Sequence, residues 1–238
     1  MNKSTNKRDY VDVIYSEVDR PLTEYPRKLA TYLYKRYGLK TKDNFLDIGC
    51  GRGEFLKGFI GCGVRGYAVD QSMAALRYCP EAELRNSDIE NDGIPYPDNF
   101  FDVVYSKSVI EHFHYPERLI KEMHRVLKPG GLAITLCPSW EYNYRTYFDD
   151  YSHRTPFMLE SLRDIQLIHG FDDVQVEYFR QLPSTWAKMK LFALPLAELT
   201  RVLSPSFLKK NIKWVRFSKE IMLLSTSRKL DLEATLAR

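Results

Sequence analysis

The chain has few cysteines, and their placement argues against two kinds of crosslinked domain. Only four occur in 238 residues, Cys50, Cys62, Cys79 and Cys137, with no Cys-x-x-Cys pair and no histidine at zinc-finger spacing. Disulfide frameworks are typical of short secreted chains that are dense in cysteine. We therefore expect neither a disulfide scaffold nor a zinc finger, and a chain of this length can bury a core without either.

Long apolar runs and a strong charge bias are also missing. No stretch approaches the ~18 consecutive apolar residues of a membrane-spanning helix. The polar start, MNKSTNKRDY, lacks the apolar centre of a secretory signal. We therefore expect a cytoplasmic protein. The net charge is only +4, which by itself favours no nucleic-acid partner.

Apolar segments and amphipathic segments alternate along most of the chain. This alternation predicts an α/β fold, in which helices cover both faces of a largely parallel sheet. Ligands bind such sheets at the carboxyl ends of the strands, so we expect the site in the turns that follow them. Strands are expected over 44–48, 64–69, 83–85, 101–106, 132–137, 174–179 and 220–226, and helices over 28–37, 54–60, 72–78, 116–127 and 159–169.

Three acidic residues follow successive expected strands beside a glycine-rich turn. The turn over 47–53 reads DIGCGRG, and its glycines let the backbone bend tightly and approach a ligand. Asp70 ends the second strand, where an acid accepts hydrogen bonds from ribose hydroxyls. Asp88 follows the third expected strand and could accept a hydrogen bond from an adenine amino group, with Ile89 packed on the adenine ring. Together the three acids predict a nucleoside site more sharply than the glycines alone.

Five segments resemble, in order and spacing, the motifs of class I S-adenosylmethionine-dependent methyltransferases. They run from Phe45 to Pro138 and read FLDIGCGRGEF, YAVDQS, NSDIE, FDVVYSKSVIEHF and LIKEMHRVLKPGGLAITLCP. The resemblance implies S-adenosylmethionine as cofactor. It also implies a Rossmann-like seven-stranded sheet of order 3-2-1-4-5-7-6, with strand seven antiparallel and helices on both faces.

The resemblance also assigns parts of the cofactor to residues. Cys50 is interpreted as a small member of the binding turn and not as a nucleophile, because no base lies near it in sequence. The expected contacts are Asp47, Gly49, Cys50 and Gly51 for the methionine part, Asp70 and Gln71 for the ribose, Asp88 and Ile89 for the adenine, and Ser106 for the sulfonium region.

Three alternatives stay open beside this interpretation. A nicotinamide dehydrogenase shares the glycines and the acid, but the loop reads GCGRG instead of GxGxxG, and Asp88 would have no role. An N- or C-methyltransferase of a small metabolite would use the same cofactor site. A non-catalytic scaffold would keep the fold alone, although it need not retain Asp47, Asp70 and Asp88.

The segment over 140–157 interleaves aromatic and polar residues where an acceptor pocket is expected. His153 is our candidate general base for an acceptor hydroxyl, because histidine titrates near neutral pH. Asp149 or Asp150 would orient it. His112 could be a general base or a packing and hydrogen-bonding residue after the fourth strand, and we do not assign it to catalysis. The spacing of these groups matches no strong ligand pattern, so we expect no metal. Expected acceptor-binding residues are Trp140, Tyr151 and Arg154.

The acceptor is expected to be a small molecule or a glycan. HRTPF, over 153–157, followed by a later Gly-Phe turn, resembles the branch that methylates bacterial surface sugars or lipid-linked glycans. Residues 1–27 are expected to form an arm or lid, and 28–180 with 219–238 the cofactor-binding domain. Residues 181–218 are expected to form a basic amphipathic helical insertion. Through 181–219 this insertion would contact an anionic membrane at its inner surface.

Overall fold

A computed structural model describes residues 9–14, 17, 21–73, 75–186, 190–205, 208 and 212–231. The chain forms two compact units that divide after Pro95, one over 1–95 and one over 96–238. About half of the expected N-terminal arm and part of the expected insertion lie outside the described residues, including Lys188, Lys209 and Lys210.

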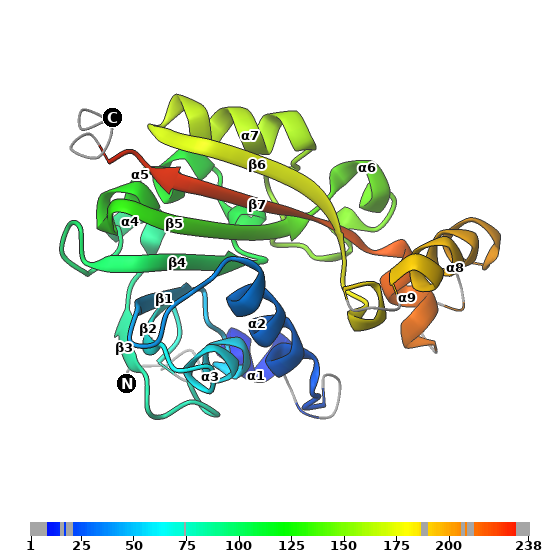
Figure 1. Cartoon of the computed structure of the whole chain (residues 1–238), viewed down its shortest axis with the longest axis horizontal. Helices are drawn as coiled ribbons and strands as arrows, with labels where there is room; N and C mark the ends of the chain where they lie inside the picture. Colours follow the sequence, from blue (N-terminus) through cyan, green and yellow to red (C-terminus); the bar gives the residue numbers. More distant parts are fainter. Residues whose placement is uncertain are drawn as a thin grey trace, which may run out of the picture. The chain divides into compact units, whose positions relative to one another are not determined.

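Seven strands form one mixed sheet of order β3-β2-β1-β4-β5-β7-β6, which confirms the expected topology (Figure 1). In the first unit β1, β2 and β3 are parallel. In the second unit β4 and β5 are parallel, and β7 runs antiparallel to both β5 and β6. The strands are β1 (Asn44–Ile48), β2 (Arg65–Asp70), β3 (Glu83–Asn86), β4 (Phe101–Lys107), β5 (Leu127–Pro138), β6 (Phe171–Arg180) and β7 (Ile221–Lys229).

Helices connect most of these strands. The α-helices are α1 (Tyr10–Ile14), α2 (Tyr25–Arg36), α3 (Glu54–Ile60), α4 (Ile89–Asp92), α5 (Pro116–Val126), α6 (Trp140–Asn143), α7 (Leu159–Ile168), α8 (Lys190–Leu203) and α9 (Lys213–Lys219). Among the described residues, the short 3-10 helices are η1 (Ile110–His112), η2 (Tyr147–Asp149) and η3 (Pro183–Thr185).

Close packing of α2, α3 and β1 builds the core of the first unit. Gly58 of α3 lies so near α2 that a Cβ there would stand 2.8 Å from the Cβ of Ala30. Phe45 of β1 stacks on Phe59 of α3 with ring centroids 4.2 Å apart, and both rings are fully buried. Burial of large aromatic surfaces stabilises this end of the sheet and fixes the loop between β1 and α3.

Residues 72, 73 and 75–78 do not form the helix expected over 72–78, so that prediction was wrong; residue 74 lies outside the described residues. The N–H of Ser72 donates a hydrogen bond to Oδ1 of Asp70 at 2.8 Å, and its hydroxyl donates to Oδ2 of Asp9 at 2.6 Å. Leu76 has a φ of +63°, a left-handed conformation that interrupts an α-helix. Leu76 and Cys79 lie against Gly53, where a Cβ would approach the Cβ of Cys79 to 2.8 Å. The segment is thus shaped to cover the glycine-rich loop.

Strand β5 starts earlier than expected. Leu127 already pairs with Phe101, and a register shift separates this pair from the next, Val103 with Leu132. The residues between them, including Gly130 at a φ of +74°, therefore belong to an irregular start of the strand instead of a loop.

Helices α8 and α9 form the expected insertion between β6 and β7 (Figure 1). Helix α8 contains Pro195 in its interior, a residue that removes one backbone hydrogen bond from a helix. Among the described residues, no helix combines the length and apolar character needed to cross a bilayer.

Candidate functional site

The carboxyl ends of β1, β2 and β3 are joined by hydrogen bonds into one surface of the first unit. The N–H of Gly49, after β1, donates to the carbonyl of Val69 in β2 at 2.8 Å. The N–H of Ser87, which follows β3, donates to the carbonyl of Asp70 at 3.1 Å. The side-chain amide of Asn86, the last residue of β3, donates to the same carbonyl at 2.9 Å. The three expected strand ends therefore meet around Asp70.

The carboxylate of Asp70 is the centre of this surface. Its side chain accepts from the N–H of Gly51 at 2.9 Å, from the N–H of Ser72 at 2.8 Å and from the hydroxyl of Tyr10 at 2.6 Å. Burial to 2% exposure raises its pKa, and these hydrogen bonds oppose the rise. Asp70 thus ties the glycine loop, the turn after β2 and helix α1 together.

The glycine-rich loop owes its shape to left-handed backbone. Gly49, Gly51 and Gly53 have φ values of +66°, +53° and +80°, which L side chains rarely adopt. A Cβ at Gly51 would meet no described atom within 4 Å, so the space beside this residue is open to a ligand. Gly53, in contrast, is also required by its contact with Cys79.

Cys50 lies within the glycine-rich loop, and Asp47 lies just before it in β1. Burial, followed by the charges of Asp47 and Asp70, raises the pKa of the Cys50 thiol well above its usual range. A protonated thiol is a poor nucleophile, which supports the interpretation of Cys50 as a turn residue. Asp47 is buried at 3% exposure at the end of β1.

Gln71, Asp88 and Ile89 form the third part of the surface. The amide of Gln71 donates to Oδ1 of Asp88 at 3.4 Å, and Asn91 donates to Oδ2 at 2.8 Å. Ile89 is 6% exposed and begins α4. Asp88 therefore follows a residue, Ser87, that is hydrogen-bonded to Asp70, and it is itself linked to Gln71; the adenine and ribose contacts stay predictions.

Ser106 lies in the second unit, near the end of β4. Its side chain is fully buried, and its hydroxyl has no hydrogen-bond partner among the described residues. A buried hydroxyl without a partner is unfavourable. Its role at the sulfonium stays a prediction.

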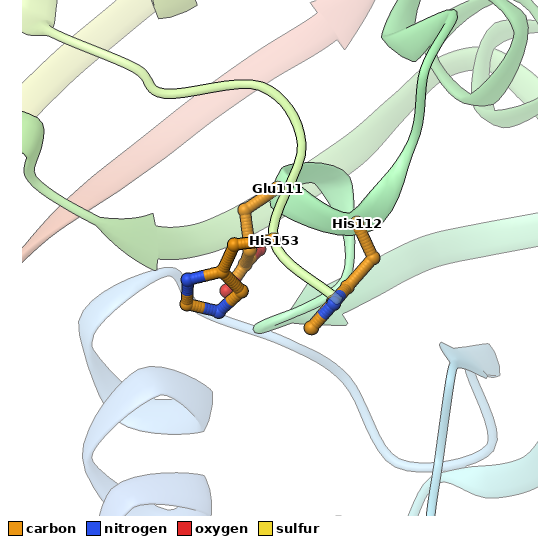
Figure 2. A group of neighbouring side chains, drawn as sticks. All are labelled: Glu111, His112 and His153. Carbon is orange, nitrogen blue, oxygen red and sulfur yellow. The ribbon is translucent and has the colours of Figure 1, made fainter. Parts of the chain in front are cut away.

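Glu111, His112 and His153 gather in the second unit, and sequence analysis had named only His153 as catalytic. Their nearest nitrogen and oxygen atoms all lie within 4.8 Å of one another. Glu111 and His112 come from η1, and His153 from the loop after η2 (Figure 2). Arg154 and Thr155 donate backbone N–H groups to the carbonyl of Glu111 at 2.7 and 3.1 Å, which holds this loop against η1.

Asp150 orients a different histidine from the one expected. The Ser152 hydroxyl donates to Oδ1 of Asp150 at 2.5 Å and contacts Nδ1 of His112 at 3.0 Å. His153 instead places Nδ1 2.6 Å from the carbonyl of Tyr147. Burial opposes ionisation of Asp150, but its hydrogen bonds from Ser152 outweigh that effect and lower its pKa. Asp149 has no hydrogen bond from its side chain to His153 among the described contacts.

The expected acceptor-binding residues lie around this cluster with different exposure. Trp140 packs edge-on against Tyr147, with centroids 5.2 Å apart. Tyr151 is 82% exposed. The guanidinium of Arg154 donates to the carbonyls of Tyr151 and His153 at 2.6 and 3.0 Å, so it braces the loop. Their contact with an acceptor stays a prediction.

Comparison with known proteins agrees with this geometry. Residues 46–135 match the family model of the methyltransferase domain. An uncharacterised methyltransferase of Schizosaccharomyces pombe is 31% identical over 149 residues, which cover 55% of this chain and 52% of that protein. The chain therefore spans about half the length of this curated relative.

Solved structures share the fold of the methyltransferase domain. A chain of the complex between the Trm112 methyltransferase activator of Haloferax volcanii and a candidate methyltransferase aligns with a TM-score of 0.70 at 17% identity, covering 95% of this chain and 100% of that one. Phosphoethanolamine N-methyltransferase 2 of Haemonchus contortus, bound to phosphomonomethylethanolamine and S-adenosylhomocysteine, aligns with a TM-score of 0.64 at 20% identity, covering 97% and 62%.

Proposed function

We propose that this protein transfers the methyl group of S-adenosylmethionine to an acceptor hydroxyl. The observation that carries the proposal is the convergence of β1, β2 and β3 on Asp70, in a segment that matches the methyltransferase domain. Asp70 would accept from the ribose hydroxyls, Asp88 from the adenine amino group, and the open backbone at Gly51 would admit the methionine part. Asp47, Gly49, Cys50, Gln71, Ile89 and Ser106 would complete the contacts.

The reaction needs alignment more than activation. The acceptor oxygen forms a bond to the methyl carbon as the carbon–sulfur bond breaks, and that electron pair stays on sulfur to leave S-adenosylhomocysteine. The hydroxyl proton leaves during transfer, and His153 would accept it on Nε2. Because the Tyr147 carbonyl can only accept, Nδ1 of His153 must donate to it, which leaves Nε2 of the neutral ring free to take a proton.

A sugar or lipid-linked glycan is the acceptor class that we propose. Support comes from the HRTPF resemblance and from the exposed ring of Tyr151, since aromatic rings suit sugar faces. The phosphoethanolamine N-methyltransferase relative favours the alternative, N-methylation of a small metabolite. Transfer of radiolabelled methyl to fractions of cell extract, followed by complete acid hydrolysis and chromatographic identification of the labelled product as an O-methyl sugar or an N-methyl amine, distinguishes the two.

Calorimetric titration with S-adenosylmethionine tests whether the protein binds the proposed cofactor. We expect one site for each chain and a measurable affinity for S-adenosylhomocysteine as well. A protein that binds neither would be the non-catalytic scaffold, and the proposal would be wrong. Binding without methyl transfer to any cell fraction would leave the cofactor site standing and remove the proposed activity.

We also propose that α8 rests on an anionic membrane surface, as the lipid-linked acceptor would require. Its apolar side chains are unusually exposed, with Leu191 at 75%, Phe192 at 76% and Leu203 at 68%. Basic Lys190 and Lys213 are exposed nearby in the chain, although Arg180 and Arg201 pair with Glu198. Flotation with phosphatidylglycerol vesicles tests this, and failure to float removes the proposal. Phe192→Ser should weaken flotation, whereas Ile168→Ser, equally exposed on α7, should not.

A further inference from the structure

Glu111 carries a buried side-chain carboxyl group, and the nearby charge of Lys107 offsets only part of the effect of its burial. The side chain is fully buried, and neither oxygen has a hydrogen-bond partner within the described part of the chain. Burial raises the pKa of Glu111 to about 8. An isolated buried carboxylate is strongly unfavourable, so such a group persists where it has a function or a missing partner.

Two imidazoles lie near this carboxylate, and the hydrogen bonds of each ring show that its Nδ1 carries a proton. The Ser152 hydroxyl has one hydrogen, and it donates that hydrogen to Asp150, so Ser152 must accept from Nδ1–H of His112. His153 donates Nδ1–H to the Tyr147 carbonyl. In the neutral form of each ring, Nε2 therefore carries the lone pair.

We propose that Glu111, His112 and His153 bind one divalent transition-metal cation, through the carboxylate and the two Nε2 atoms. Two neutral imidazoles and one carboxylate are a donor set that suits Zn²⁺, Mn²⁺ or Fe²⁺. Metal-binding histidines commonly donate their other ring N–H to a carbonyl or to a carboxylate-linked group, and both do so here. The cation supplies the positive charge that Glu111 lacks.

The cluster is close to the required size. Metal bonds of about 2.0–2.2 Å place ligand atoms about 3 to 3.5 Å apart, whereas one possible donor atom from each of the three residues lies within 4.8 Å of the other two. Small rotations of the three side chains close this difference. Three protein ligands leave further coordination positions open, and an acceptor hydroxyl bound there would lose its proton more readily. This catalytic consequence rests on the proposed function. His153 would then act as a ligand, and the proton would leave to water.

The experiment uses the full-length, tag-free protein after treatment with a chelator. Titration with Zn²⁺ and, separately, with Mn²⁺ should give one site for each chain. At about 100 times the dissociation constant, the cation should raise the midpoint of thermal unfolding by about 5–10 °C. Mg²⁺ should bind more weakly, because imidazole is a poor ligand for it.

Glu111→Gln and His153→Ala separate a metal site from a structural cluster. Glu111→Gln keeps the shape of the side chain and removes the carboxylate that would bind the metal, so without metal its unfolding midpoint should be close to that of the wild type. Both variants should lose at least tenfold in Zn²⁺ affinity. His114→Ala, on an exposed position of the same loop, should bind Zn²⁺ like the wild type.

The outcomes distinguish this inference from the proposed function. A wild-type protein that binds S-adenosylmethionine but neither Zn²⁺ nor Mn²⁺ overturns the metal site alone, as does a Glu111→Gln variant with unchanged Zn²⁺ affinity. A protein that binds the cation but not S-adenosylmethionine overturns the proposed function and leaves the metal site intact.

Discussion

The hydroxyl of Tyr10 donates a 2.6 Å hydrogen bond to Oδ1 of Asp70, the carboxylate that we propose for the cofactor ribose. Helix α1 thereby reaches the site through one side chain. Tyr10 is 36% exposed, so its hydroxyl can be displaced without disturbing the core. Ribose and Tyr10 would compete for the same oxygen atom.

Tyr10→Phe should therefore tighten the binding of S-adenosylmethionine. A hydrogen bond of this kind contributes about 0.5–1.5 kcal/mol net, so its removal from the free protein should increase affinity about 2- to 10-fold. Titration calorimetry measures the change, with Tyr115→Phe, an exposed residue of the second unit, as control. Weaker binding by Tyr10→Phe would mean that the hydroxyl assists the cofactor and does not compete with it.

Asp70→Asn should weaken the binding of S-adenosylmethionine by about 10- to 100-fold. Hydrogen bonds to a charged acceptor contribute about 1.5–3 kcal/mol, and the amide would also face the N–H groups of Gly51 and Ser72. Asp102→Asn removes a carboxylate that pairs with Lys128 at 2.7 Å and should leave cofactor affinity unchanged. An unaltered affinity in Asp70→Asn would remove Asp70 from the site.

Periodicity and turn chemistry were sufficient to predict most of the fold. The helix over 54–60 and the strand over 44–48 were predicted with the bounds observed, because glycines and short apolar runs delimit them sharply. Residues 72–78 failed because side chains distant in sequence decide their conformation. Asp9 and Asp70 bind Ser72, and no local pattern in the sequence shows this.

The candidate site was predictable only in part, for the same reason. Asp47, Asp70 and Asp88 follow strands, so topology alone brings them together. Glu111 gave no such signal, since its importance lies in complete burial without a partner and in His153, which comes from another loop. The Tyr10 contact was equally invisible, because α1 is short and no strand leads into it.

His153→Gln should reduce methyl transfer while leaving the affinity for S-adenosylmethionine unchanged. Loss of a general base typically costs about 10²- to 10⁴-fold in rate. The assay is radiolabelled methyl transfer to the active cell fraction, with His114→Gln as the matched exposed control. Full turnover by His153→Gln would show that the acceptor needs no assistance from this residue.

His124 should make stability depend on mildly acidic pH. Burial, followed by the charge of Lys229, lowers the pKa of His124, while Gly170 and Asp172 oppose the shift. The folded protein thus binds protons more weakly than the unfolded chain, and stability is lost as pH falls below about 6.5. Thermal unfolding between pH 7.5 and 5.5 should show a smaller decline in His124→Gln than in the wild type. Equal declines would contradict this assignment.

Gln166→Leu should destabilise the second unit by about 2–4 kcal/mol. The buried amide of Gln166 donates to the Ser225 hydroxyl at 2.7 Å and accepts from the Ser227 hydroxyl at 2.8 Å, so leucine leaves two buried hydroxyls unpaired. Urea unfolding measures the loss. The exposed Gln175→Leu should change stability by less than about 0.5 kcal/mol, and an equal loss in both variants would refute the network's role.

Arg180 and Ile221 are direct register partners at the ends of β6 and β7, although η3, α8 and α9 lie between them in the chain. The segment that contains η3, α8 and α9 therefore leaves the sheet and returns to it at the same place. A tight hairpin turn could connect β6 and β7 there just as well. The segment between β6 and β7 can therefore be exchanged, lengthened or deleted without changing the strand order that supports Asp70. Related proteins that share this sheet could differ in this segment and so bind different acceptors.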